Sequence, residues 1–269
     1  MSNLRTYVAL ALVLLFVLLA VFASFVAPRD PFKGGADALL SPGNKGFVLG
    51  SDHLGRDILS ELIFGARVSL AVGISAALSA SILGIIVGSL AGFFGGWVDG
   101  ILMRLSEFFQ TLPRFVLALV IVAFFGGGVF KVIVVLAILS WPQIARLVRA
   151  QILSLRESTF VEAARLSGMG SLRIIVREIL PNALAPVIVT GSLDVASAIL
   201  LEASLSFFGL GDANLVSWGG MLNVAQPYLR QAWWMAVFPG IAISLIVLSF
   251  NVLGDALNDA LNPRLQESA

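Results

Sequence analysis

The sequence predicts an all-α integral membrane protein with six transmembrane helices. Of its 269 residues, 58% are hydrophobic and only 12% are charged, whereas soluble domains carry about 25% charged residues. The apolar residues gather in long runs, and an α-helix needs about 20 of them to cross a bilayer. In lipid every backbone N–H and C=O must be hydrogen-bonded within the protein, which a helix achieves by itself.

Composition also excludes several function classes. The formal net charge is +1 and basic residues form no run interleaved with aromatics, so no nucleic-acid partner is expected. The chain has no cysteine and one histidine, His53, which leaves no cluster of thiolate or imidazole metal ligands. It lacks the Gly-x-x-x-x-Gly-Lys-Ser/Thr sequence of ATPases. We therefore expect no enzyme activity, no catalytic residue, no metal and no cofactor bound by this chain.

Residues 1–27 contain the first predicted span. Tyr7 to Ala27 is an apolar run that follows Arg5. A cleaved signal peptide is the competing interpretation, but its apolar core is usually about 7–15 residues long. We expect an uncleaved membrane helix with the N-terminus in the cytoplasm.

Residues 28–67 are polar and punctuated by proline, glycine and asparagine, which predicts an external loop. Within it, Asp52 and Asp57 are expected to cap helices or to lie as solvated loop charges. His53 is expected to be an exposed loop residue and not a metal ligand. We expect packing and anchoring roles in this loop, not chemistry.

Residues 68–269 are predicted to form a core of five further helices. The predicted spans are Ser69–Phe94, about Leu112–Phe125, Val129–Leu147, Asn182–Leu205 and Trp234–Asn251. Gly95–Gln110 is predicted to be a short inside loop because it carries charges, and Gly126–Gly128 an outside turn.

The second span carries a small-residue motif. Gly84, Gly88 and Gly92 recur at four-residue intervals. In lipid, small residues at this spacing let two helix backbones approach closely. We expect this helix to pack inside the bundle.

Between the fourth and fifth spans, at about residues 150–181, the sequence becomes polar and basic. Arginine recurs at Arg146, Arg149, Arg156, Arg165, Arg173 and Arg177. A charge near the bilayer centre costs about 2.5–3.5 kcal/mol, so this stretch must face water. The positive-inside rule then places it in the cytoplasm.

This polar stretch is predicted to be a helical hairpin. Thr159 and Glu162 have the spacing of a capping box, and Gly168 ends the first helix. Ser171 is placed to cap a second helix, which ends at Pro181 because proline cannot continue the helix.

One face of the first hairpin helix is predicted to dock on another protein. Phe160, Ala163, Ala164 and Ser167 share this face at i, i+3, i+4, i+7 spacing. Together they make a small, flat surface with one aromatic projection, which suits a groove on a partner.

The fifth span holds two acidic residues, Asp194 and Glu202. Ionisable groups at membrane depth are costly, and they indicate a functional role by default. Both are candidates for lining the pathway or forming a gate. Glu202 is expected near the outer interface, where capping or pairing is the alternative.

Four aromatic residues predict an interfacial belt on the outer side. They are Trp218, Tyr228, Trp233 and Trp234. Tryptophan and tyrosine concentrate where the bilayer meets water, so we expect these rings at the membrane surface.

Several segments carry a resemblance to a known family. They are Glu162-Ala163-Ala164 with Gly168 and Leu180-Pro181, then Leu49–Asp57, Leu205–Gly211, Trp218–Leu222 and Phe250–Arg264. With these motifs the chain resembles ABC importer permeases of the dipeptide, oligopeptide and nickel family, the C-type inner-membrane component of a binding-protein-dependent transport system. Two departures stand out: Glu178 takes the place of the usual isoleucine, a shift typical of this branch, and residues 212–216 replace a proline-rich stretch.

The resemblance implies a type I ABC importer permease bundle in the cell's inner membrane, with both termini cytoplasmic. It implies a second, related permease chain, two ATPase subunits that hold ATP and Mg, and an external solute-binding protein. It assigns ATPase coupling to Phe160, Glu162, Ala163, Ala164, Arg165, Gly168, Leu180 and Pro181. The coupling helix would transmit ATPase closure to the membrane part.

The sequence leaves alternatives open for the solute and for the class of transporter. Di- or oligopeptides are the first choice, because the peptide members are the broader part of the family, and nickel is the alternative. An ion-coupled secondary transporter would need its own ion site at broken, repeat-related helices, and the two halves of the sequence show no repeat. A scaffold without transport would leave Asp194 unexplained.

Overall fold

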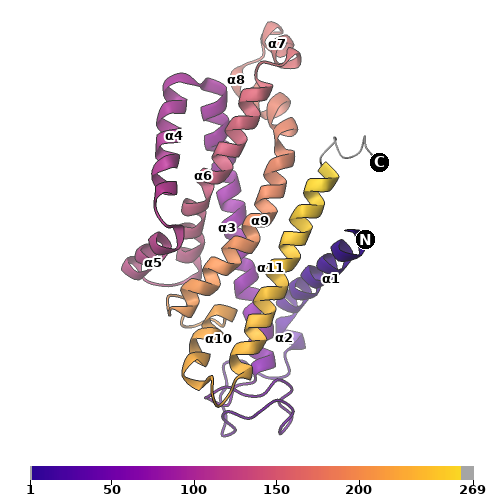
Figure 1. Cartoon of the computed structure of the whole chain (residues 1–269), viewed down its shortest axis with the longest axis vertical. Helices are drawn as coiled ribbons and strands as arrows, with labels where there is room; N and C mark the ends of the chain where they lie inside the picture. Colours follow the sequence, from indigo (N-terminus) through magenta and orange to yellow (C-terminus); the bar gives the residue numbers. More distant parts are fainter. Residues whose placement is uncertain (1, 262–269) are drawn as a thin grey trace.

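The computed structural model describes residues 2–261, and helices build its architecture (Figure 1). The long helices are α1 (Ser2–Val21), α3 (Ile58–Phe94), α6 (Val129–Leu155), α9 (Leu180–Phe207) and α11 (Trp234–Leu261). The short ones are α2 (Ala23–Val26), α4 (Gly96–Thr111), α5 (Arg114–Phe125), α7 (Thr159–Leu166), α8 (Ser171–Ile174) and α10 (Trp218–Ala225), with a π-helical turn η1 (Ile175–Ile179) and a 3-10 turn η2 (Gln226–Tyr228). Within this described range, β-pairing is limited to one bridge between Ser51 and Asp57. The predicted all-α class is confirmed.

Five helical segments of the described chain are long and apolar enough to cross a membrane, or six if α4 and α5 form one broken span. The two helices of this pair are bent by 87° relative to each other. Alone, the 12 residues of α5 fall short of the about 20 that a crossing needs. The third predicted span, at about Leu112–Phe125, is therefore not a complete crossing by itself.

Residues 95–110 are not the inside loop that we predicted, because α4 occupies them. Their charges suggested a loop, but Asp99 is paired with Arg149 of α6, with Oδ1 2.5 Å from Nε. A charge that is paired with a neighbouring helix does not interrupt a helix.

The chain becomes helical at Ile58, before the predicted end of the external loop at residue 67. Asp57 is the N-cap of α3, and its carboxylate accepts a hydrogen bond from the Ser60 N–H at 2.8 Å. The capping alternative for Asp57 is thereby confirmed. The guanidinium of Arg67 is hydrogen-bonded within the chain, since its Nε donates to the Ala20 carbonyl at 2.9 Å.

The two ends of the bundle carry different elements (Figure 1). α7 and α8 form a hairpin at one end, whereas α10 and the segment of residues 28–57 lie at the opposite end. α3, α6, α9 and α11 run between the two ends. α11 returns from the α10 end toward the hairpin end.

Gly84, Gly88 and Gly92 of α3 lie directly against α6. A Cβ atom on Gly88 would come within 2.4 Å of the Ala145 carbonyl oxygen, and one on Gly84 within 2.6 Å of the Ile144 Cβ. No side chain fits at such distances, so the two backbones approach as the glycine spacing predicts. Helices α3 and α6 are thereby joined along their length.

The predicted aromatic belt is wrong for two of its members. Trp218 and Trp234 are buried, and their indole N–H groups donate to the carbonyls of Leu62 at 2.9 Å and Ser51 at 3.1 Å. A buried indole needs such an acceptor, and the loop and helix start supply one for each ring. Trp233 does remain half exposed.

His53 is also less exposed than predicted. Its side chain is 26% exposed, and its ring stacks on Tyr228 with centroids 5.1 Å apart. Among residues 2–261, no group of three acidic or histidine side chains is placed to hold a metal ion.

Candidate functional site

The α7–α8 hairpin is the candidate coupling site, and its first turn differs from the prediction. Ser158, not Thr159, stands at the N-cap, and it makes no side-chain capping bond. Its hydroxyl donates instead to the carbonyl of Leu155 at 2.5 Å, in the preceding helix. The predicted capping box is therefore wrong, because Thr159 is already the first helical residue.

Gly168 ends α7 as predicted. Its φ of +78° lies in the left-handed region, which favours glycine over residues with a Cβ atom. The Met169 N–H then bonds back to the Ala164 carbonyl at 3.1 Å and closes the helix end. The chain can thus reverse into α8.

The second arm of the hairpin does not end at Pro181. Residues 171–207 form one continuous 37-residue helical segment, with Gly170 and not Ser171 at its N-cap. Before the proline the helix widens into η1, where the Leu180 N–H bonds to the Ile175 carbonyl. The wider turn accommodates a residue that has no N–H. The hairpin is therefore a direct extension of the membrane helix α9.

Helix α7 has a buried face and an exposed face. Val161 and Ala164 belong to the same buried cluster as Ile152 of α6 and Ile174 of α8. The prediction that Ala164 lies on the docking face is wrong, since it is only 8% exposed. A sequence with two adjacent alanines gave no sign of which one faces inward.

Two exposed leucines at the hairpin tip were missed by the sequence analysis. Leu166 is 85% exposed and Leu172 is 72% exposed. They stand close to Gly168, on either side of the turn between α7 and α8. The sequence did contain a sign of this exposure: both leucines lie next to a turn that was predicted to face water, where polar residues are usual.

Most of the other predicted coupling residues lie on the same exposed surface. Those exposed on α7 or at its end are Phe160, Glu162, Ala163, Arg165 and Gly168. Leu180 and Pro181 do not join them, because η1 separates them from α8 and they open α9. We call the exposed residues of α7 together with Leu172 the hairpin surface.

Arginines fasten the base of the hairpin to neighbouring helices. The Arg165 guanidinium lies 5.6 Å from the centre of the Phe93 ring in α3. The Arg156 Nη1 donates to the Gly92 carbonyl at 3.2 Å. These arginines make separate contacts and do not converge on one anion site.

Asp194 is buried in α9, and its Oδ2 has no hydrogen-bond partner. The charged group that interacts with it electrostatically is Arg114, the first residue of α5. Arg114 donates one hydrogen bond to the Ser140 hydroxyl, while its Nε has no partner. Two opposite charges at membrane depth are thus incompletely hydrogen-bonded, which fits the default expectation of a functional role.

Glu202 is buried and fully engaged. Its carboxylate accepts hydrogen bonds from Ser69 of α3 at 3.1 Å and from Ser206 at 2.7 Å. These bonds connect α9 to α3. They favour the pairing alternative for Glu202 over a gate.

These observations define a multi-pass membrane protein, in which a bundle of helices long enough to cross a bilayer carries at one end a hairpin that exposes Leu166 and Leu172. Residues 84–267 match the family described as "Binding-protein-dependent transport system inner membrane component". The chain belongs to this family. The predicted family is confirmed.

Curated relatives and solved structures agree with this assignment. The chain is 43% identical to the "Di/tripeptide transport system permease protein DppC" of Pseudomonas aeruginosa, covering 97% of this chain and 88% of the relative. It is 44% identical to the "Dipeptide transport system permease protein DppC" of Escherichia coli K12, with 98% and 91% covered. A chain of the inward-facing MetNI methionine ABC transporter aligns with a TM-score of 0.61 at 20% identity, over 75% of this chain and 96% of that one. The fold is therefore that of an ABC importer permease.

Proposed function

We propose that this chain is a membrane-spanning subunit of an ATP-driven, binding-protein-dependent importer of di- or oligopeptides. It would form half of the translocation pathway. The observation that carries the proposal is the similarity, over nearly the whole chain, to permeases named for dipeptide transport. The chain itself would catalyse no reaction, and ATP and Mg would act in partner subunits.

The proposed partners are a second permease, two ATPase subunits and an external solute-binding protein. The hairpin surface supports an ATPase contact. Leu166 and Leu172 are exposed, and burying them against a partner would lower the free energy of the complex. We place the hairpin and both termini in the cytoplasm and residues 28–57 outside the cell membrane. The arginines around the hairpin support this orientation.

The proposed mechanism is alternating access, driven from the hairpin. Closure of the ATPase pair would displace α7 and α8. Because residues 171–207 are one helical segment, the displacement would pass directly into α9. The packing of Val161 in one cluster with Ile152 offers a second route, into α6. In free-energy terms, nucleotide binding and the membrane conformation would be linked through one bistable element.

Asp194 is our candidate for a pathway or gate residue within this mechanism. It lies on α9, the helix that the hairpin would move, and it keeps an unpartnered oxygen near Arg114. We expect Asp194→Asn to lower the rate of uptake while the ATPase subunits still bind. Glu202 serves as its comparison, since Ser69 and Ser206 already satisfy it.

The test is uptake of a labelled dipeptide into proteoliposomes that hold the complete complex and its external binding protein. We expect uptake to require ATP and to be lost in a Glu162→Arg, Gly168→Pro double variant. Uptake without ATP, or undiminished uptake by the double variant, would contradict the proposal. Labelled nickel in the same assay decides between the two solutes.

A further inference from the structure

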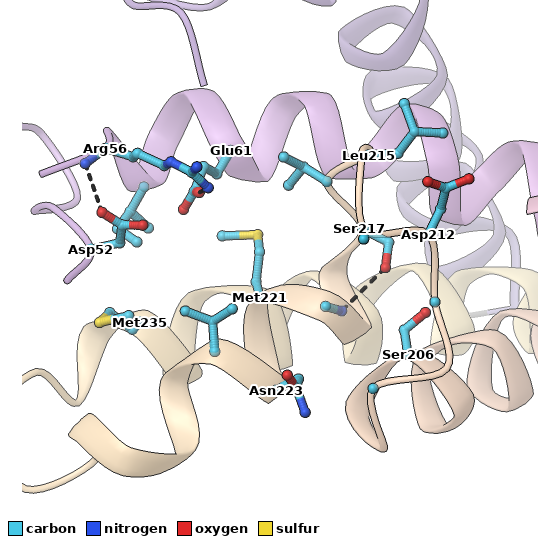
Figure 2. Close-up of a pocket in the computed structure, with 17 residues that line it drawn as sticks. Asp52, Arg56, Glu61, Ser206, Asp212, Leu215, Ser217, Met221, Asn223 and Met235 are labelled. Carbon is cyan, nitrogen blue, oxygen red and sulfur yellow. Dashed lines mark hydrogen bonds and ion pairs between the residues drawn. The ribbon is translucent and has the colours of Figure 1, made fainter. Parts of the chain in front are cut away.

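A cavity of about 280 Å³ lies at the end of the bundle opposite the hairpin. Residues that precede and open α3, the loop after α9, and α10 form its walls (Figure 2). Its apolar lining includes Leu215, Met221 and Met235, with Met221 in the middle (Figure 2). Its polar groups are divided between the two ends.

One end of the cavity presents a guanidinium with unused donors. The Arg56 Nη1 forms a long ion pair with Glu61, 3.9 Å from its Oε1, which is too far for a hydrogen bond. The Arg56 Nε is buried and has no partner. The carboxylate of nearby Asp52 is turned to other partners: its Oδ1 accepts from the backbone N–H groups of Leu54 and Arg56 at 2.8 and 2.7 Å, and its Oδ2 lies 3.7 Å from the His53 Nδ1. Because protein encloses Nε, an incoming carboxylate would bind the Nη groups of Arg56, where it would compete with Glu61.

The other end presents oxygen acceptors. Asp212 accepts one hydrogen bond, from the Asn214 N–H at 3.0 Å, through Oδ1. Ser206 and Ser217 stand beside it, with Glu202 behind them along a neighbouring hollow. Figure 2 shows Arg56 and Asp212 at opposite ends, with Met221 between them. An ammonium group would find its acceptors at the Asp212 end.

We infer that this cavity is a subsite for the two charged termini of a short peptide, with Arg56 binding the carboxylate and Asp212 the ammonium group. The inference rests on the proposed function and names the recognition that the transporter itself would perform. A guanidinium can bind a carboxylate through two parallel hydrogen bonds. The flexible side chains of Met221 and Met235 can adapt to different peptide side chains.

The size of the cavity points to short peptides. Pockets for small molecules usually measure about 300–1,000 Å³, and this one lies at the lower limit. A dipeptide fits such a space, whereas a long peptide would have to extend out of it. In the proposed orientation the cavity lies on the side from which the solute arrives.

The test is equilibrium binding of labelled Ala-Phe to the complete complex in nanodiscs, without the external binding protein. The variants are Arg56→Gln and Asp212→Asn, with Arg230→Gln as the control for loss of an arginine outside the cavity. We expect each cavity variant to weaken binding about 10- to 100-fold, as for hydrogen bonds to charged groups. The control should bind like the wild type.

Blocked peptides separate the two assigned roles. C-amidated Ala-Phe should bind equally to the wild type and to Arg56→Gln, because the carboxylate is already gone. N-acetylated Ala-Phe should bind equally to the wild type and to Asp212→Asn. Equal losses for every peptide form, or no loss at all, would overturn the inference.

Two further outcomes show which proposal has failed. If the variants bind peptide normally but no longer bind the external binding protein, the cavity serves docking and the inference is wrong. If the wild-type complex imports peptides and both variants import them with unchanged KM, only the inference fails. If the wild-type complex imports no peptide, the proposed function fails as well. Thermal unfolding of each variant checks that the fold is retained.

Discussion

The hairpin end and the α10 end of the bundle differ in how many of their side chains are buried or hydrogen-bonded within the chain. At the α10 end, Trp218 and Trp234 are buried with bonded indole groups, and Asp57 caps α3. At the hairpin end, Leu166 and Leu172 project away from the protein, and neither α7 nor α8 has a side-chain cap. One end is held by its own contacts, whereas the other leaves apolar side chains exposed.

The two ends are connected through closely packed helices. Gly84 and Gly88 of α3 leave no space between that helix and α6. Val161 of the hairpin packs in the same cluster as Ile144 and Ile152 of α6. In the proposed mechanism, a movement that begins at the hairpin would therefore pass through packed side chains and backbone, not through a flexible linker.

The strongest test of this contrast is the loss of a buried ring at the α10 end. We expect Trp218→Ala to lower the free energy of unfolding by about 3–5 kcal/mol, because the ring is fully buried and packs on Phe16 at 5.4 Å. The matched control, Trp97→Ala on the hairpin side of α4, removes an exposed ring and should cost about 0.5 kcal/mol or less. Denaturant unfolding in detergent micelles measures both, and equal losses would contradict the contrast.

The connection between the ends is tested with glycine. Gly88→Ala places a methyl group against the Ala145 carbonyl, and we expect a loss of about 1–3 kcal/mol from overpacking. Gly100→Ala on α4 meets no atom within 4 Å, and it should stabilise its helix by about 0.5–1 kcal/mol. The same unfolding experiment compares the pair. No loss at Gly88→Ala would show that α3 and α6 are not closely packed, and an equal loss at Gly100→Ala would show that the effect is not specific to their contact.

A smaller effect distinguishes the helix starts of the two ends. Asp57→Ala removes a capping carboxylate and should cost about 1 kcal/mol. Ser158 precedes α7 but makes no capping bond. We expect Ser158→Ala to lower the free energy of unfolding by about 0.5 kcal/mol, because it removes the hydrogen bond to the Leu155 carbonyl. The difference is measured from the denaturant concentrations at the unfolding midpoints, with the same dependence of the free energy on denaturant in both variants. A larger loss at Ser158 would mean that the hairpin helix does depend on a cap.

The smallest stability effect is expected at the hairpin tip. Leu166→Ser changes an exposed side chain, so the free energy of unfolding should stay within about 0.5 kcal/mol of the wild type. Val161→Ser, on the buried face of the same helix, should be clearly destabilising because it loses apolar burial and buries a hydroxyl. Similar values for the two variants would show that α7 does not have one buried and one exposed face.

The sequence predicted the membrane class, the glycine seam and the hairpin, because each depends on local pattern. Long apolar runs require helices in lipid, and four-residue glycine spacing allows close approach whatever the partner helix. Gly168 marked the end of α7 correctly, since a left-handed turn favours glycine. Such features need no knowledge of distant residues.

The errors arose where distant residues decide the outcome. The charge of Asp99 indicated a loop, but Arg149 of α6 pairs with it and the segment is helical. The interfacial position of Trp218 was wrong because the Leu62 carbonyl accepts its N–H inside the protein. Ala164 is buried because it packs in the cluster that includes Ile152. None of these partners lies near in sequence, so local periodicity could not find them.

The most direct test of the contrast between the two ends is the affinity of the purified ATPase subunits for the permease complex in nanodiscs. We would compare the wild type with Leu166→Ser and Leu172→Ser, and use Leu166→Met as the control that keeps an apolar side chain. We predict that each serine variant weakens ATPase binding about 10-fold or more, as expected for lost apolar burial, and that the methionine variant binds normally. Unchanged affinity in both serine variants would contradict the proposal that the ATPase subunits bind the hairpin surface.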